Sequence, residues 1–106
     1  MSAPVVALST VATAEDATRI ARDLVEQRLA ACVNVLPGIV STYRWQGKIE
    51  TEGEHLLVIK TRRDRVPALK AALLALHPYE VPELLVLPVE DGLAPYLAWL
   101  DASVTA

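Results

Sequence analysis

The chain is poor in the residues that build covalent or metal-linked frameworks. Among its 106 residues there are one cysteine, Cys32, two histidines and no phenylalanine. A single cysteine excludes a disulfide within the chain. One cysteine and two histidines are also too few for a closed Cys/His zinc site built from one chain. These counts favour a cytosolic protein, because stabilising disulfides belong to oxidising compartments.

Long hydrophobic runs and an excess of positive charge are missing as well. No stretch of eighteen apolar residues occurs, so we expect no membrane span. The first residues, Met1 to Pro4, lack the basic and apolar regions of a secretory signal. Ten basic residues against thirteen acidic ones give a net charge of −3, which argues against a nucleic-acid partner. We therefore expect a cytoplasmic protein with no membrane or nucleic-acid partner.

Apolar side chains, in contrast, are slightly in surplus. Hydrophobic residues make up 53% of the chain. Counted with glycine and without tyrosine the share is about 54%, against about 45–50% in ordinary domains on that count. The length predicts a single domain spanning residues 1–106. A domain this small buries only roughly two thirds of the surface of its unfolded chain. The surplus must therefore stay exposed, form a binding surface or be buried by other copies of the chain.

Hydrophobic spacing predicts four strands and three helices. Thr13 precedes Asp16 by three residues and is expected to cap the first helix, while Asp64 is expected to cap the second. Pro78 ends the second helix near His77. Pro37-Gly38 predicts a bulge or a bend, and Gln46-Gly47 a tight turn or a bulge. The predicted strands cover 4–11, 32–49, 54–62 and 83–89. The first predicted helix covers 14–30, and the other two begin at 64 and 95.

The order β-α-β-β-α-β-α predicts an α+β sandwich of the ferredoxin-like type, β-α-β-β-α-β with an added C-terminal helix. Two long helices would cover one face of its sheet, and the short last helix is too small to cover the other. The long hairpin within 32–62 would project from the domain and could pair with another chain. Pro88 places the last strand at an edge or a bulge.

Few residues point to chemistry, and each has a plain structural alternative. We expect Cys32 to be a small buried apolar residue and His55 to be a solvated strand residue. His77 is either a helix C-cap or a metal ligand. Lys60 lies between apolar neighbours and needs a partner if buried. The carboxylates of the hairpin either keep an exposed turn soluble or face basic residues of a neighbouring copy; they are Glu50, Glu52 and Glu54.

No catalytic motif and no pairing of a nucleophile with a base is visible, so we expect no enzyme. Five blocks in order nevertheless match one family. They are 29–34 (LAACVN), 41–50 (STYRWQGKIE), 59–61 (IKT), 77–83 (HPYEVPE) and 96–100 (YLAWL). Through them the chain resembles the CutA divalent-cation tolerance proteins over about residues 5–104.

The resemblance implies a ferredoxin-like protomer assembled as a homotrimer, with an architecture similar to that of PII signalling proteins. It implies a non-enzymatic role in the response to and tolerance of divalent metal ions, with copper or another divalent metal as the bound ion. Some bacterial members bind metal through a cysteine in the first strand and two adjacent histidines. Ser9 and Leu76 stand at two of these positions, and only His77 matches. A site would therefore borrow ligands from a neighbouring protomer.

The resemblance also suggests a cleft between subunits. Its matched residues are Tyr43, Trp45, Lys60, Tyr79, Glu80 and Glu83, with Cys32 as a further candidate. The alternative is that these residues serve trimer packing and strand pairing. If the cleft does bind a ligand, the protein could instead be a PII-like signalling or scaffold trimer that takes a small anion or a protein partner, with Lys60 in contact with it.

Overall fold

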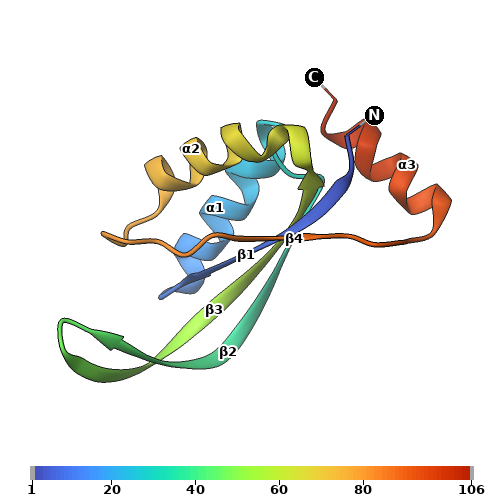
Figure 1. The fold of residues 1–106 in the computed structure, drawn as a ribbon. Coiled ribbons are helices and arrows are strands. Elements are labelled where there is room, and N and C mark those ends of the chain that lie inside the picture. The colour runs from blue at the N-terminus through green and yellow to red at the C-terminus, as the bar shows by residue number, and fades with distance from the viewer. Residues whose placement is uncertain (1, 106) are drawn as a thin grey trace.

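The structure is a computed structural model that describes residues 2–105. The elements of this part are β1 Pro4–Val11, α1 Ala14–Glu26, β2 Cys32–Trp45, β3 Lys48–Arg62, α2 Val66–Leu76, β4 Leu85–Pro88 and α3 Ala94–Ser103. The strands form one antiparallel sheet in the order β2-β3-β1-β4, and α1 and α2 lie side by side over one of its faces (Figure 1). The α+β sandwich of ferredoxin-like type is thereby confirmed.

The core lies between the sheet and these two helices. In β1 every second residue is buried, and Val5, Ala7 and Val11 are fully enclosed. Ile20 and Leu24, four residues apart on α1, are fully buried against the same cluster. The alternating strand pattern and the helical spacing thus meet at one interface, as the sequence predicts.

The first helix begins as predicted and ends earlier than predicted. Thr13 Oγ1 accepts a hydrogen bond from the Asp16 amide at 3.1 Å. We expected the helix to continue to residue 30, but it ends at Glu26 because Arg28 adopts a left-handed φ of 57°. The Leu29 amide then donates to the Leu24 carbonyl at 3.0 Å, which satisfies one of the free carbonyls at the helix end.

The expected capping role of Asp64 is wrong. Asp64 lies in a 3₁₀ turn, Arg63–Arg65, and its carboxylate accepts from the Arg62 guanidinium at 3.0 and 3.1 Å. Helix α2 therefore begins at Val66 without a side-chain cap and with Pro67 in its first turn. It ends at Leu76 with His77 as the C-cap, as the following proline predicts.

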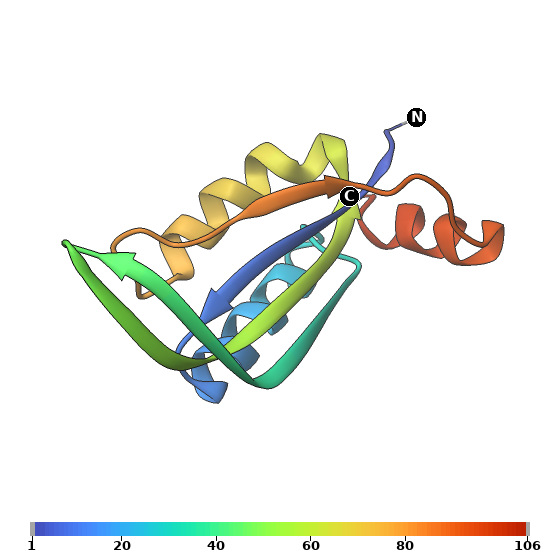
Figure 2. The same ribbon diagram turned by 60° about the horizontal axis from the view of Figure 1, so that its bottom comes forward.

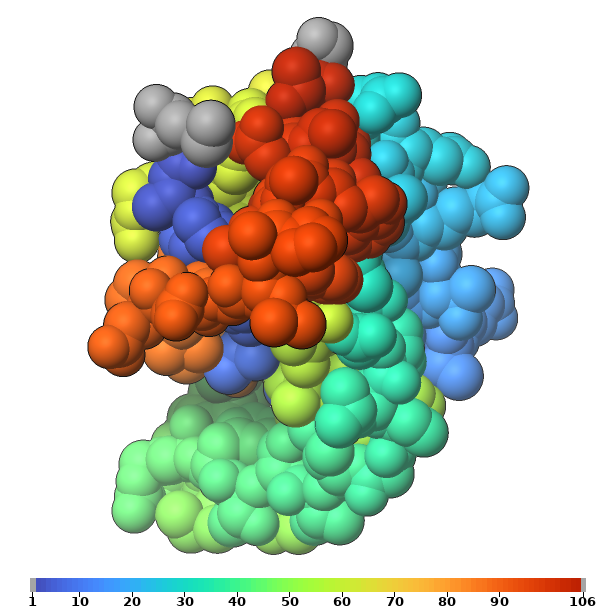
Figure 3. Space-filling model, turned by 90° about the vertical axis from the view of Figure 1, so that its right-hand side faces the viewer, coloured from blue at the N-terminus to red at the C-terminus, as the bar shows by residue number. Residues whose placement is uncertain are grey.

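The β2–β3 hairpin spans the predicted residues, but its two strands are divided differently. Strand β2 ends at Trp45, before the expected end at residue 49, and β3 begins at Lys48, six residues before its expected start. Gln46 and Gly47 form the turn with φ values of 49° and 80°, the signs that a two-residue type I′ turn requires. The register slips between Leu36 and Ile39, so Pro37 and Gly38 make the bulge. In Figure 3 the tip of the hairpin (green) projects at the bottom of the view, below the rest of the chain.

The second face of the sheet carries no helix across it. Figure 2 looks onto this face, and α3 lies beside it, where Leu100 and Val104 form a small cluster with Ala31. Strand β4 is an edge strand as predicted, although it covers only Leu85–Pro88 of the expected 83–89. Within residues 2–105, no helix has both the length and the apolar character needed to cross a membrane.

Candidate functional site

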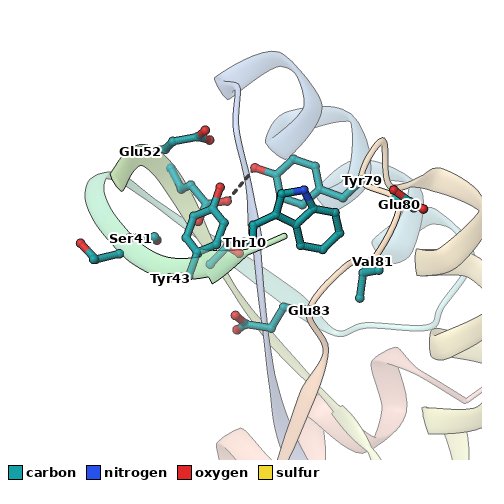
Figure 4. Close-up of a pocket in the computed structure, with 11 residues that line it drawn as sticks. Thr10, Ser41, Tyr43, Glu52, Tyr79, Glu80, Val81 and Glu83 are labelled. Carbon is teal, nitrogen blue, oxygen red and sulfur yellow. Dashed lines mark hydrogen bonds between the residues drawn. The ribbon is translucent and has the colours of Figure 1, made fainter. Parts of the chain in front are cut away.

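A pocket of about 580 Å³ lies between the hairpin and the segment that follows α2. We call it the hairpin pocket. Figure 4 shows Tyr43 on the hairpin facing Tyr79 on the other wall, with Glu83 below them. Its lining residues are Thr10, Ser41, Thr42, Tyr43, Trp45, Glu52, Glu54, Tyr79, Glu80, Val81 and Glu83.

The bulge in β2 decides which hairpin side chains reach this pocket. Before it, Leu36 pairs with Leu56; after it, Ile39 pairs with Glu54 and Ser41 with Glu52. Strand β2 therefore advances three residues while β3 advances two. Side chains alternate between faces along a strand, so the extra residue transfers the odd-numbered residues of β2 to the face of the even-numbered residues of β3. Tyr43 and Trp45 consequently share a face with Glu52 and Glu54.

Hydrogen bonds to β1 fix the opposite wall. His77 is buried, and its Nδ1 accepts from the Tyr79 amide at 3.1 Å. Its Nε2 must then carry the proton and donate to the Thr10 carbonyl at 2.7 Å. Ser9 Oγ donates to the Glu83 carbonyl at 2.7 Å. The segment 77–83 is thereby held against β1, with Tyr79 and Glu83 lining the pocket.

The pocket is acidic, and its carboxylates influence one another. Tyr79 OH donates to Glu54 Oε2 at 2.6 Å, and burial together with this carboxylate raises the pKa of Tyr79 far above its ordinary value. Partial desolvation against the pocket wall, and then the negative charge of Glu54, raises the pKa of Glu83, although its side chain is exposed. Burial, and then Glu52, raises the pKa of Tyr43. None of the described residues that line the pocket is a lysine or an arginine.

The cleft residues expected from the sequence fall into two places. Tyr43, Trp45, Tyr79, Glu80 and Glu83 all line the hairpin pocket. Lys60 and Cys32 do not: they are cross-strand partners near the other end of the sheet, where the Lys60 ammonium lies 5.9 Å from the Tyr96 ring centre. Along β3, Lys60 lies six residues from Glu54, the nearer β3 residue of the pocket, which is roughly 20 Å at the usual rise per residue.

Two expectations about polar residues need correction. Glu54 does not keep an exposed turn soluble, because only 6% of it is exposed. His55 is half-buried rather than solvated, and its Nδ1 has no hydrogen-bond partner among residues 2–105. We also missed Glu52 and Glu54 as pocket residues. Their spacing of two placed them on one face, but the sequence held no sign that Tyr79 would meet them.

The described residues of one chain do not complete a divalent-metal site. No group of three Cys, His, Asp or Glu side chains within residues 2–105 is arranged to hold an ion. Both nitrogens of His77 already make hydrogen bonds. Cys32, the one free thiol, lies near Lys60 and far from His77 along the sheet. The metal role of His77 stays a prediction, and it requires the imidazole to exchange the Thr10 carbonyl for an ion.

Comparison with known proteins agrees with this fold over nearly the whole chain. The sequence model of the CutA1 divalent ion tolerance protein family matches residues 5–103. The chain is 52% identical over 95 residues to the divalent-cation tolerance protein CutA of Thermus thermophilus, an alignment that covers 90% of this chain and 92% of that protein. It is 55% identical over 84 residues to protein CutA of Homo sapiens, covering 79% of this chain and 47% of that one.

The chain therefore spans about half the length of the human relative and nearly all of the bacterial one. Among solved structures, CutA of Xylella fastidiosa matches with a TM-score of 0.95 at 48% identity, over 98% of this chain and 100% of that one. The resemblance read from the five sequence blocks is confirmed. The chain belongs to the CutA1 divalent ion tolerance protein family.

Proposed function

We propose that the chain acts as a non-enzymatic homotrimer that binds divalent cations, copper among them, in tolerance of divalent metals. Membership of the family implies a relation to divalent-cation tolerance. The observation that carries cation binding is the hairpin pocket, which has four carboxylates and, among its described lining residues, no basic side chain. Such a pocket concentrates positive ions by electrostatic attraction.

Assembly is supported by the uncovered face of the sheet. Leu36, Leu85 and Leu87 are 44%, 58% and 46% exposed there, beside the half-buried Leu56 and Val58. Contiguous apolar surface of this kind marks an interaction site in a water-exposed protein. Copies of the chain related by a three-fold axis would cover this face in each protomer and account for the apolar surplus of the composition.

Metal binding in this proposal needs the assembly. One chain offers His77 and the pocket carboxylates without a complete set of ligands. A copper or other divalent ion would draw its remaining ligands from a neighbouring protomer, as several ligands are needed for tight binding. The cytosolic location and the non-enzymatic character stay predictions of the same proposal.

A metal titration with a mass measurement tests the proposal. Purified protein is titrated with Cu²⁺ and with Zn²⁺ by calorimetry, and the thermal midpoint is recorded with and without metal. We expect a mass of three chains and a metal-dependent rise in the midpoint, because a ligand that binds the folded state stabilises it.

The rise should shrink in His77→Ala and persist in His55→Ala, the matched control. Equal rises in the wild type and His77→Ala would remove His77 as a ligand, and a monomer without metal response would overturn the proposal.

A second candidate is a PII-like signalling or scaffold trimer that binds a small ligand or a protein partner in a cleft between subunits. Lys60 supports it, because this half-buried side chain lies on the uncovered face of the sheet, outside the acidic hairpin pocket, with its ammonium 5.9 Å from the Tyr96 ring centre. For an anion, the test is metal-free calorimetry with inorganic phosphate. Binding that is lost in Lys60→Ala would support this candidate, and the absence of phosphate binding would count against it.

A further inference from the structure

The walls of the hairpin pocket combine two kinds of surface. Three aromatic rings, those of Tyr43, Trp45 and Tyr79, line it from the hairpin and from the segment after α2. Four carboxylates, those of Glu52, Glu54, Glu80 and Glu83, are spread around the same space. In Figure 4 Tyr43 and Tyr79 approach from opposite walls, while Glu52, Glu80 and Glu83 lie on different sides of the two rings.

This distribution of charge disfavours an anion, and the pocket of one chain does not by itself complete a site for a bare metal ion. An anion would enter a space with four nearby carboxylates and no basic side chain among the described lining residues. A bare divalent ion needs several oxygen or nitrogen ligands within roughly 2.0–2.6 Å. Residues 2–105 offer no such group of three. Carboxylates spread around a pocket are better suited to an organic cation, whose charged group is attached to a larger molecule.

The aromatic rings of the pocket indicate what kind of cation would fit. An ammonium or guanidinium group is attracted to the face of an aromatic ring within about 6 Å of its centre. Aromatic rings also cover the apolar part of a ligand, while carboxylates at the edge hold its charged end. Glu54 is fixed by Tyr79, whose hydroxyl donates to it at 2.6 Å, so this carboxylate and this ring present a prearranged surface.

We propose that the hairpin pocket binds an organic cation that carries a primary ammonium or a guanidinium group on an aromatic or otherwise apolar body. The proposal rests on the proposed function in one respect, that the pocket is a site for cations. It goes further in the class of ligand, because a single chain already supplies the carboxylates and the rings that such a ligand needs.

Calorimetry with probes of matched shape tests the class of ligand. Phenethylamine, which is an ammonium at neutral pH, is compared with phenylacetate and with the neutral 2-phenylethanol. We expect phenethylamine to bind at least about tenfold more tightly than phenylacetate, and its affinity to fall as salt is added, because salt screens exposed charges. Equal affinity for the amine and the carboxylate would overturn the proposal.

Variants then assign the binding to the pocket. Glu83→Gln and Glu52→Gln each remove one charge with little change of shape, and each should weaken phenethylamine binding about fivefold, as expected for a lost charge-assisted contact. Glu90→Gln removes one charge from an exposed position outside the pocket and should leave the affinity unchanged. Circular dichroism checks that each variant is folded. Unchanged affinity in both pocket variants, or an equal loss in Glu90→Gln, would contradict the assignment.

A Cu²⁺ arm separates this inference from the proposed function. Binding of Cu²⁺ without any binding of phenethylamine would overturn the organic-cation site and leave the metal role standing. Binding of phenethylamine without Cu²⁺ would support the inference and count against the metal role. Binding of neither would remove the pocket as a site for cations.

Discussion

Single residues of the hairpin pocket owe their properties to distant parts of the chain. Glu54 and Tyr79 are 25 positions apart, yet the hydroxyl of one donates to the carboxylate of the other at 2.6 Å. Glu54 is buried, and the pKa of Tyr79 is raised by burial and then by this carboxylate, because the ionised phenol would be desolvated and would lie beside a negative charge. Tyr79 therefore stays protonated and acts as a hydrogen-bond donor at neutral pH.

The negative charge of Glu54 also acts on Glu83, where it makes ionisation of a carboxyl group less favourable. The pKa of Glu83 is raised above the usual 4.5 by partial desolvation and then by Glu54. A carboxyl whose pKa is higher in the folded than in the unfolded chain holds its proton more tightly when folded, so its ionisation lowers the free energy of unfolding as pH rises past the unfolded value. We expect Glu83→Gln to raise the thermal midpoint at neutral pH, and this gain to vanish below about pH 4.5.

Thermal midpoints of the wild type and Glu83→Gln across this pH range check the expectation. Glu90→Gln, outside the pocket, serves as the charge control and should show no comparable rise in the gain between acidic and neutral pH. A Glu83→Gln gain that grows on acidification would have the wrong sign and would refute the explanation.

At the scale of elements, the hairpin is the part that builds the pocket. Its bulge at Pro37 and Gly38 places Tyr43 and Trp45 on the same face as the carboxylates of β3. Its turn depends on Gly47, whose φ of 80° is accessible to glycine at little cost and strains any other residue. The position of the pocket wall therefore depends on two short irregularities rather than on the long regular stretches between them.

Replacing the turn glycine should weaken the fold measurably. We expect Gly47→Ala to lower the free energy of unfolding by about 1 kcal/mol, because alanine disfavours positive φ. Gly53→Ala is the matched control: Gly53 lies within β3, has no left-handed φ, and a methyl group there would meet no atom within 4 Å. Urea denaturation of the three proteins gives the comparison. An equal effect at both glycines would mean that the turn geometry is not the cause.

At the scale of the whole molecule, the chain is elongated and incompletely covered. Its radius of gyration is 14.3 Å, against about 13 Å for a compact chain of this length, and its principal extents are 44 × 25 × 22 Å. The hairpin accounts for the extension, and the uncovered sheet face remains beside it (Figure 2). Both features leave apolar groups in water unless other copies of the chain cover them.

A charge placed on the uncovered face should disrupt the proposed assembly. Leu87→Glu puts a carboxylate on β4, and we expect the solution mass to fall from three chains to one because burying an unpaired charge is costly. Leu74→Glu is the control, since Leu74 is 66% exposed on α2, on the opposite side of the sheet from this face. Sedimentation of both variants measures the mass. A trimer that persists in Leu87→Glu would place the interface elsewhere.

Local signals in the sequence predicted most of the fold, and they failed where the chain bends. Thr13, Pro67 and Pro78 marked helix ends correctly, because capping and ring geometry act within a few residues. Arg28 and Asp64 misled the prediction. Distant contacts accompany both. Arg28 bends left-handed where Arg65 donates to its carbonyl, and the Arg62 guanidinium that holds Asp64 also donates to Asp101.

The site was predicted only in part for the same reason. The family resemblance singled out Tyr43, Trp45 and Tyr79, which do line one pocket. It also grouped them with Lys60, which the structure places elsewhere on the sheet. The pocket carboxylates of β3 carried no local signal, because only the bulge and the fold of 77–83 bring Tyr79 to Glu54.

The sequence by itself determined the class of fold, the family and the apolar surplus, since periodicity, caps and ordered motifs are local properties of the chain. The tertiary structure decided the character of the candidate site. It placed four carboxylates and three aromatic rings around one space and left Lys60 and Cys32 outside it. The physical reason is register: one extra residue in β2 changes which side chains share a face, and no property of a single residue records that choice.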